Sequence, residues 1–157
     1  MEPRFIVDIN VGRLARWLRA MGYDAVLFTR EDDNDMVRTA LKEDRIILTK
    51  DRGILQRRLA ATGRLRVVHL TSDIVREQLR QMVAALALNP THHPFSRCLE
   101  CNRPLEERNK EEVEGHVPPH VFRTQREFSQ CPSCGRIYWQ GTHWEAMRRK
   151  LGELGAG

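Results

Sequence analysis

Four short apolar runs alternate along the first half of the chain with segments whose apolar residues recur every three or four positions. The runs are Phe5–Val7, Ala25–Phe28, Ile46–Thr49 and Val67–Leu70. Their apolar residues are consecutive, which is typical of strands that are buried on both faces of a parallel sheet. The alternation of strands with helices therefore predicts an α/β fold, in which helices cover both faces of the sheet.

The predicted helices follow from the periodic segments. Apolar residues at i, i+3, i+4 and i+7 from Leu14 to Met21 predict the first helix, and Gly22 is a natural end for it. The second helix would be capped by Asp33 or Asn34. A longer apolar stripe from Ile74 to Leu86 predicts a helix after the fourth strand.

The second half of the chain has a different character. Residues 91–94 read as a linker, and residues 95–141 have little helical periodicity but contain all four cysteines. An amphipathic segment, Trp144–Leu151, predicts a last helix. We therefore expect two domains, a sheet domain at residues 1–90 and a smaller domain at residues 95–157 that includes the last helix.

The four cysteines form two Cys-x-x-Cys pairs separated by 29 residues: Cys98 and Cys101, then Cys131 and Cys134. Two such knuckles are typical of a tetrahedral Cys₄ zinc site, in which the ion is structural. Nothing in the sequence argues for the oxidising compartment that a disulfide framework needs. The sequence predicts a zinc ribbon, with an inserted loop between Asn102 and Gln130.

Composition adds few constraints. The 26 Lys and Arg against 21 Asp and Glu give a net charge of +5, which is compatible with a polyanionic partner but does not demand one. No run approaches the ~18 apolar residues of a transmembrane helix. The first residues do not resemble a signal peptide, so we expect a cytoplasmic protein without membrane association.

Acidic residues follow every predicted strand, and the carboxyl ends of parallel strands share one edge of a sheet. These residues are Asp8, then Asp32, Asp33 and Asp35, then Asp51, and finally Asp73. Clustered carboxylates repel one another unless a cation such as Mg²⁺ or Mn²⁺ neutralises them, and such an ion can activate water against a phosphodiester. Asp33 and Asp73 could equally be helix caps, whereas Asp8 and Asp51 directly terminate strands and are stronger candidates.

Side chains suited to nucleic acid accompany both predicted sites. Four cations lie near the strand-terminal acids along the chain: Arg13, Arg16, Lys50 and Arg52. We expect them to contact phosphates, and we expect Arg19 to lie on a solvated helix face. In the ribbon, Arg136 and Trp139 are suited to single-stranded RNA through phosphate contact and base stacking. The alternative is that Tyr138 and Trp139 pack against the first domain.

Several motifs occur together in this chain. They are Asp8, Gly12–Arg19, Gly22-Tyr23-Asp24, Ile47–Arg52, Phe95–Cys98, Cys101-Asn102 and Cys131–Trp139 with Gly141 and His143. Together they resemble the Mut-seven C-terminal ribonuclease family, in which a PIN-like nuclease domain carries a zinc ribbon. The resemblance covers the chain from about Phe5 to about Leu151. It implies a PIN-like fold and divalent-metal-dependent cleavage of RNA, with Asp8, Asp33 and Asp51 as the catalytic, metal-binding acids.

Two other functions are compatible with parts of the sequence. An aspartate that ends the third strand, such as Asp51, is where a receiver-like domain accepts a phosphoryl group. The first strand supplies a single acid, however, and no strand with a lysine follows Leu70. The other alternative is a non-catalytic RNA-binding adapter whose acids are helix caps. We expect the protein to be a ribonuclease that acts on single-stranded RNA. Its expected cofactors are structural Zn²⁺ and catalytic Mg²⁺ or Mn²⁺.

Overall fold

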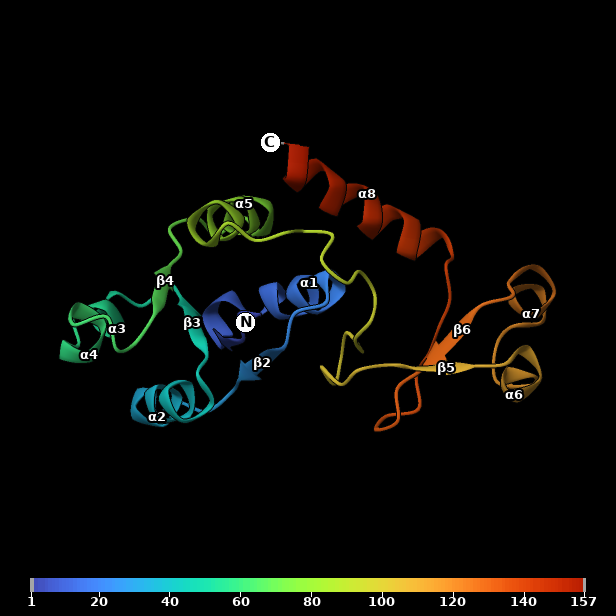
Figure 1. Ribbon diagram of the computed structural model, residues 1–157, viewed down its shortest axis with the longest axis horizontal. Helices are drawn as coiled ribbons and strands as arrows, with labels where there is room; N and C mark the ends of the chain where they lie inside the picture. Colours follow the sequence, from blue (N-terminus) through green and yellow to red (C-terminus); the bar gives the residue numbers. More distant parts are fainter. Residues whose placement is uncertain (1, 157) are drawn as a thin grey trace.

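A four-stranded parallel sheet forms the first half of the computed structural model, which describes residues 2–156 (Figure 1). Its strands are β1 (Phe5–Asp8), β2 (Ala25–Phe28), β3 (Ile46–Thr49) and β4 (Val67–His69), in the spatial order β2-β1-β3-β4. All three strand pairs are parallel, and Val7 of β1 is paired with both Leu27 and Leu48. The predicted α/β fold is confirmed.

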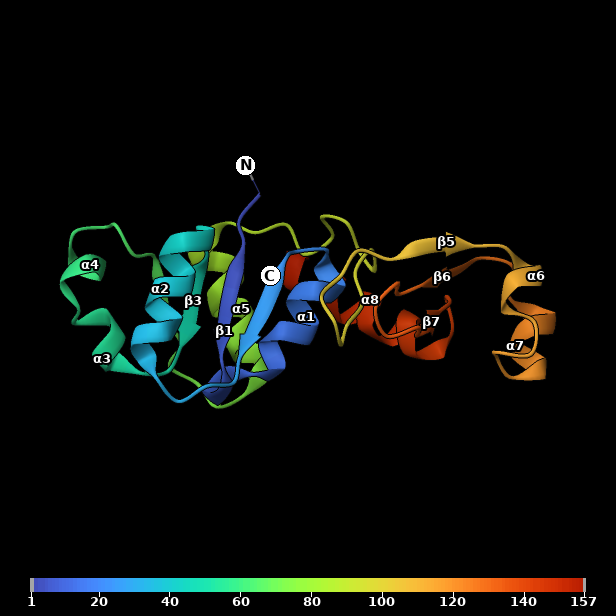
Figure 2. The same cartoon turned by 90° about the horizontal axis from the view of Figure 1, so that it is seen from below.

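Helices cover both faces of this sheet, as Figure 2 shows. They are the 3₁₀ turn η1 (Ile9–Val11), α1 (Arg13–Met21), α2 (Asp33–Glu43), α3 (Arg52–Leu55), α4 (Arg58–Ala61) and α5 (Val75–Leu86). Val7 and Leu48 pack with α1 and α5, whereas Ile6 and Ile47 pack with α2 and α3. Successive strand residues thus enter opposite hydrophobic layers, which explains why both must be apolar.

The predicted cap of α2, Asp33 or Asn34, was wrong. The N-cap of α2 is Asp32, whose carboxylate accepts a hydrogen bond from the backbone N–H of Asn34. Asp33 lies instead in the first turn of the helix. Before α5, the Ser72 hydroxyl accepts the backbone N–H of Ile74, and Asp73 is exposed.

The ribbon contains a three-stranded antiparallel sheet in the order β5-β6-β7. Its strands are β5 (Glu106–Arg108), β6 (Phe128–Gln130) and β7 (Ile137–Tyr138). The segment that the sequence predicted as an inserted loop forms a structured arm with two short helices, α6 (Lys110–Val113) and α7 (Pro119–Thr124). The arm has a small core of Val113, Val121 and Phe128, and it ends far from the parallel sheet (Figure 2).

The last helix, α8 (Thr142–Ala156), returns from the ribbon to the sheet domain (Figure 1). Its residues Met147 and Leu151 lie in the same hydrophobic core as α1 and α5. The division into domains at residues 1–90 and 95–157 stays a prediction. Helix α8 belongs to the second of these segments but packs on the first. None of the helices within residues 2–156 combines the length and the apolar character that crossing a bilayer requires.

Candidate active site and zinc centre

Thr49, the last residue of β3, links the acids that follow β1 and β3. Its hydroxyl donates to the Asp8 carboxylate (Oγ1–Oδ2 2.7 Å) and accepts the backbone N–H of Asp51 at 2.9 Å. Thr49 is fully buried and Asp8 is 9% exposed, so the pair is fixed inside the edge of the sheet. Adjacent parallel strands therefore bring Asp8 and Asp51 together, and the sequence analysis did not single out Thr49 as the residue that positions them.

Asp33 reaches the same edge from the first turn of α2. Partial burial raises the pKa of the Asp33 carboxyl, and the charge of Asp51, a side-chain hydrogen bond with Asp51 and the charge of Asp8 raise it further. A carboxyl whose pKa is raised by the charges of other carboxylates lies near them. The three acids predicted to be catalytic thus lie together in the fold, although they come from three different elements.

The other acids that follow strands have partners of their own. Asp32 caps α2, Asp35 faces Arg38 (Oδ1–Nη2 3.3 Å), and Asp73 forms an ion pair with Lys50. Asp33 differs from these acids, because the charged neighbours that most affect it are the carboxylates of Asp51 and Asp8.

Asp51 also caps a helix, which is the role that the sequence offered as the alternative to metal binding. Its Oδ1 accepts the backbone N–H of Gly53 at 2.8 Å at the start of α3. The hydrogen bonds given above engage Oδ2 of Asp8 and Oδ1 of Asp51. Asp8, Asp33 and Asp51 thus bring carboxylate oxygens, the ligand type that a hard divalent cation such as Mg²⁺ or Mn²⁺ prefers, to one edge of the sheet, although their oxygens do not all lie within 4.8 Å of one another.

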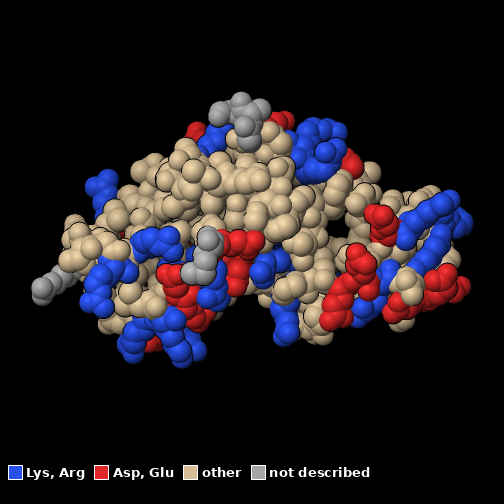
Figure 3. Space-filling view, in the orientation of Figure 1, with Lys and Arg blue, Asp and Glu red and all other residues tan. Residues whose placement is uncertain are grey.

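The cations predicted to contact RNA are not equally available. Three of them are exposed and form no side-chain hydrogen bond or ion pair with residues 2–156: Arg13, Arg52 and Arg136. By contrast, Arg16 pairs with Glu100 of the ribbon at 2.7 Å, and Lys50 pairs with Asp73. On the face that Figure 3 shows, basic and acidic side chains are interspersed, so the net charge is not gathered there into one basic patch.

Arg57 is a further cation at the acidic edge, which the sequence analysis missed. Its guanidinium donates to the Asn34 side chain (Nη1–Oδ1 2.7 Å), and its charge acts against the rise in the pKa of Asp33. Arg57 follows Asp51 by six positions, but it lies in the irregular turn between α3 and α4. No periodicity in the sequence indicates which way that turn points.

The four cysteines converge as their spacing predicted. Their Sγ atoms all lie within 4.8 Å of one another, and those of Cys98 and Cys134 are 3.7 Å apart. Sulfurs that bind one tetrahedral Zn²⁺ at ~2.3 Å are ~3.8 Å apart, whereas a disulfide would join them at ~2.05 Å. The cluster thus fits a metal such as zinc.

Backbone amides and one tyrosine surround these sulfurs. The N–H groups of Ser133 and Cys134 point at the Cys131 sulfur. Burial opposes ionisation of this thiol, but these two amides are among the groups that lower the pKa of Cys131 to about 7. The Tyr138 hydroxyl lies 3.2 Å from the Cys98 sulfur and accepts the backbone N–H of Leu99 at 3.1 Å. Tyr138 therefore orients a cysteine ligand from the outer shell of the site.

Tyr138 and Trp139 lie in different environments, although the sequence analysis treated them together. Tyr138 packs against the core that α1 and α5 share. Trp139 is half-buried and packs against Val113, Val121 and Phe128 in the arm of the ribbon. Trp139 therefore belongs to the ribbon's own core, and its exposed part is what remains available to a base.

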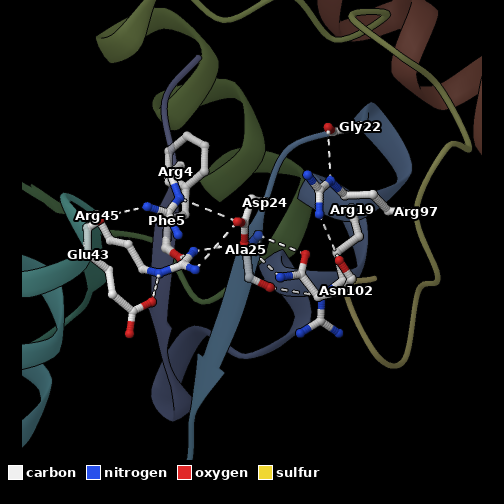
Figure 4. A network of polar contacts seen from close by, with 10 residues as sticks. All are labelled: Arg4, Phe5, Arg19, Gly22, Asp24, Ala25, Glu43, Arg45, Arg97 and Asn102. Carbon is white, nitrogen blue, oxygen red and sulfur yellow. Dashed lines mark hydrogen bonds and ion pairs between the residues drawn. The ribbon is translucent and has the colours of Figure 1, made fainter. Parts of the chain in front are cut away.

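Arg19, which we expected on a solvated face, is 7% exposed and joins the two parts of the chain (Figure 4). Its guanidinium donates to the carbonyls of Ala25 (2.9 Å) and Leu99 (2.8 Å). Desolvation by burial lowers the pKa of Arg19. Because α1 presents Arg19 beside the ribbon's first knuckle, this charge is used to hold two backbones and not to contact a phosphate.

Asp24 forms the centre of a second contact between the sheet domain and the ribbon (Figure 4). It accepts hydrogen bonds from Arg45 (Nη1–Oδ1 2.8 Å) and from the Asn102 side chain (Nδ2–Oδ1 2.7 Å). The side-chain oxygen of Asn102 (Oδ1) in turn accepts the backbone N–H of Ala25 at 2.9 Å. Asp24, Arg19 and Asn102 belong to the motifs that carry the family resemblance, and the structure shows that they join the ribbon to the sheet domain.

Comparisons with known proteins agree with these motifs. The family model described as "Mut7-C RNAse domain" matches residues 3–151, which include the acidic edge and all four cysteines. No curated protein and no solved structure matches the chain. The match covers nearly the whole sequence, and the chain therefore belongs to the Mut7-C RNAse domain family, whose description indicates a ribonuclease-like function.

Proposed function

We propose that this protein is a divalent-metal-dependent ribonuclease whose active site comprises Asp8, Asp33 and Asp51. The observation that carries the proposal is the convergence of three acids from β1, α2 and the end of β3. Thr49 fixes two of them, and the third lies against Asp51. Such a group of carboxylates is costly to a fold unless a cation neutralises it, so its presence supports a metal-binding role.

The protein's own residues prepare the site for that ion. The Thr49 hydroxyl donates to one oxygen of Asp8, and the Gly53 N–H donates to one oxygen of Asp51, so both carboxylates are held in place. When bound, Mg²⁺ or Mn²⁺ supplies the polarisation of the phosphodiester and the activation of water. Arg52 and Arg57 lie at the same edge and are suited to bind the phosphates of the RNA.

We propose further that RNA is bound as a single strand. The exposed Arg13 and Arg136 and the exposed part of Trp139 are suited to phosphate contact and stacking. Affinity for single-stranded RNA should then fall steeply between ~50 and ~200 mM salt, because bound cations are released from the RNA when arginines replace them. Affinity that does not change with salt would contradict this part of the proposal.

The test is cleavage of an end-labelled single-stranded RNA with and without Mg²⁺ or Mn²⁺. Asp8→Asn, Asp33→Asn and Asp51→Asn should each reduce the rate by at least ~100-fold, since even outer-shell partners of a metal are worth ~10–100-fold. Asp35→Asn is the matched control, because Asp35 lies two residues from Asp33 but faces Arg38, and it should cleave normally. Wild-type rates in Asp51→Asn would refute the proposed site.

The alternative function is a non-catalytic RNA-binding adapter, and one observation favours it. Asp51 caps α3, and this structural role would explain the acid without any part in catalysis. The same assay distinguishes the two functions: an adapter would bind the labelled RNA but leave it intact at every metal concentration.

A further inference from the structure

A second group of side chains that commonly bind metals lies at the amino end of the sheet, opposite the acidic edge. Glu2 precedes β1, and His92 and His93 lie in the linker between α5 and the ribbon. One ligand atom from each of the three lies within 4.8 Å of the other two. The His92 Nε2 is 2.7 Å and the His93 Nε2 is 3.9 Å from the same oxygen, Oε1 of Glu2.

We propose that Glu2, His92 and His93 form a second metal site, which binds a borderline divalent cation, Zn²⁺ above all. Ligands placed ~2.0–2.2 Å from a tetrahedral Zn²⁺ are ~3.4 Å apart. The two nitrogen–oxygen separations lie on either side of that value, so small side-chain rotations complete the geometry. Two imidazoles and one carboxylate are a common ligand set for Zn²⁺, whereas Mg²⁺ prefers oxygen ligands alone.

The two imidazoles are held in place by the surrounding fold. The His92 ring stacks on Tyr23, with centroids 4.9 Å apart and planes 8° from parallel. The Tyr23 hydroxyl is fixed by the backbone of Asn89, to whose carbonyl it donates and whose N–H it accepts, each at 3.1 Å. His92 therefore presents its Nε2 towards Glu2 from a rigid platform.

The backbone of His93 is equally constrained. Its N–H donates to the carbonyl of Met21 at 2.9 Å, and its carbonyl accepts the Ser96 hydroxyl at 2.7 Å. This backbone lies so close to Gly22 that a Cβ there would be 2.4 Å from the His93 carbonyl oxygen. The close approach requires glycine at position 22, and it docks the linker on the end of α1.

An ion at this site would connect distant parts of the chain. It would tie the segment before β1 to the linker that leads to the ribbon, about 90 residues later. Glu2 and His93 are exposed, so the ion keeps at least one position for water. Because the unfolded chain does not hold these three groups together, binding the ion stabilises the folded protein. The proposal is independent of the nuclease activity.

The experiment counts zinc in the untagged full-length protein after equilibrium dialysis against ~100 µM free Zn²⁺. The parent protein and all its variants carry Asp51→Asn, so that zinc does not bind at the acidic edge. We expect two zinc ions per chain, one in the ribbon and one at the new site. His92→Gln and His93→Gln should retain only the ribbon ion, with affinity for the second at least ~10-fold weaker. His120→Gln is the control, because His120 is an exposed histidine of the ribbon arm, and it should retain both ions.

A thermal melt provides a second measurement on the same proteins. Adding Zn²⁺ to protein whose ribbon is already loaded should raise the melting temperature of the parent and of His120→Gln, but not that of His92→Gln or His93→Gln. The proposal is overturned if the parent takes up only one ion. It is also overturned if the His92→Gln and His93→Gln variants take up as many ions as the parent with the same affinity.

Discussion

The two ends of the parallel sheet place carboxylates in opposite electrostatic surroundings. At the carboxyl end, burial and the neighbouring acids Asp51 and Asp8 raise the pKa of Asp33. At the amino end, burial also opposes ionisation of Asp24, but hydrogen bonds from Arg45 and Asn102 lower its pKa to about 2. One end thus disfavours its negative charge, and the other end favours it.

This difference separates stability from function within one sheet. The amino end is where the ribbon docks, and its charges are neutralised by partners that the fold itself supplies. The carboxyl end gathers three acids whose neighbouring cations, Arg57 among them, do not offset their mutual repulsion. Uncompensated charge of this kind is typical of a site that awaits a ligand, and here the ligand that fits is a cation.

The largest effect should come from breaking the zinc site, because the ribbon supplies Asn102 and the Leu99 carbonyl to the amino end. Structural zinc contributes about 10 kcal/mol or more of binding free energy to small domains. Cys134→Ser should therefore abolish amide protection across residues 98–139. It should also lower the stability of the sheet domain, whose Asp24 and Arg19 lose partners. Hydrogen exchange followed by mass spectrometry measures both effects.

The control for this variant is Ser133→Ala, an exposed position between two ligands, which should keep normal protection. Full protection of the ribbon in Cys134→Ser, or purified protein without zinc, would contradict a structural Cys₄ site.

Asp24→Asn should have the next largest effect. The Arg45 guanidinium is 5% exposed and would lose one of its two carboxylate partners, although Glu43 would remain at 2.8 Å. Removing one member of a buried ion pair is strongly destabilising, and with Glu43 still present we expect a loss of about 2 kcal/mol. Urea denaturation measures it.

Asp44→Asn is the matched control at the same end of the sheet. Asp44 is 78% exposed and lies 3.6 Å from Arg66, so its loss should change the free energy of unfolding by less than about 0.5 kcal/mol. Equal effects of the two substitutions would show that the Asp24 network is not a stabilising junction.

The pH dependence of stability should report the same network. Because the pKa of Asp24 is about 2 in the folded protein and ~3.9 in the unfolded chain, its contribution is fully present above pH ~4. This contribution is lost as the pH falls from ~4 through about 2, and it amounts to about 2 kcal/mol. Unfolding by urea between pH 2 and 5 should show a shallower acid slope in Asp24→Asn than in the wild type. Identical slopes would contradict the assignment.

Sequence patterns predicted the elements of this fold well, and they predicted partners less well. Consecutive apolar residues predict a strand buried on both faces, and Cys-x-x-Cys spacing predicts converging sulfurs, because each pattern is local. Arg19 was expected in solvent, because its helix position is polar by periodicity alone. Its partners, the carbonyls of Ala25 and Leu99, are backbone groups that every residue carries, and the latter lies 80 residues away. No local pattern can indicate such a contact.

The acidic edge shows the same limit. Sheet polarity places Asp8 and Asp51 together from the sequence alone, but it does not distinguish Asp33 from Asp32 or Asp35, which share its loop. The family resemblance implied Asp33, and the structure shows the physical difference: one neighbour caps α2 and the other faces Arg38. Thr49 and Arg57 act at this edge through contacts that depend on strand register and on an irregular turn.

The smallest expected change in stability is at the carboxyl end, and its sign is what matters. Asp51→Asn removes one charge from a group of three acids while Asn still caps α3, since Asn and Asp are equally good N-caps. With the ribbon zinc bound and Mg²⁺ and Mn²⁺ absent, its free energy of unfolding should equal that of the wild type or exceed it by up to about 1 kcal/mol. Thermal and urea unfolding, run beside the cleavage assay, measure this.

Asp51→Ala separates the two roles of this carboxylate. It removes the same charge but also the acceptor for the Gly53 N–H, so it should lose about 1 kcal/mol relative to Asp51→Asn. Both variants should lose cleavage, and Mg²⁺ should stabilise neither as it stabilises the wild type. If Asp51→Asn is instead as destabilised as Asp51→Ala when Mg²⁺ and Mn²⁺ are absent, the acids do not repel one another there. The carboxylates at the carboxyl end would then be neutralised by the protein itself, as those at the amino end are, and the contrast drawn between the two ends of the sheet would be wrong.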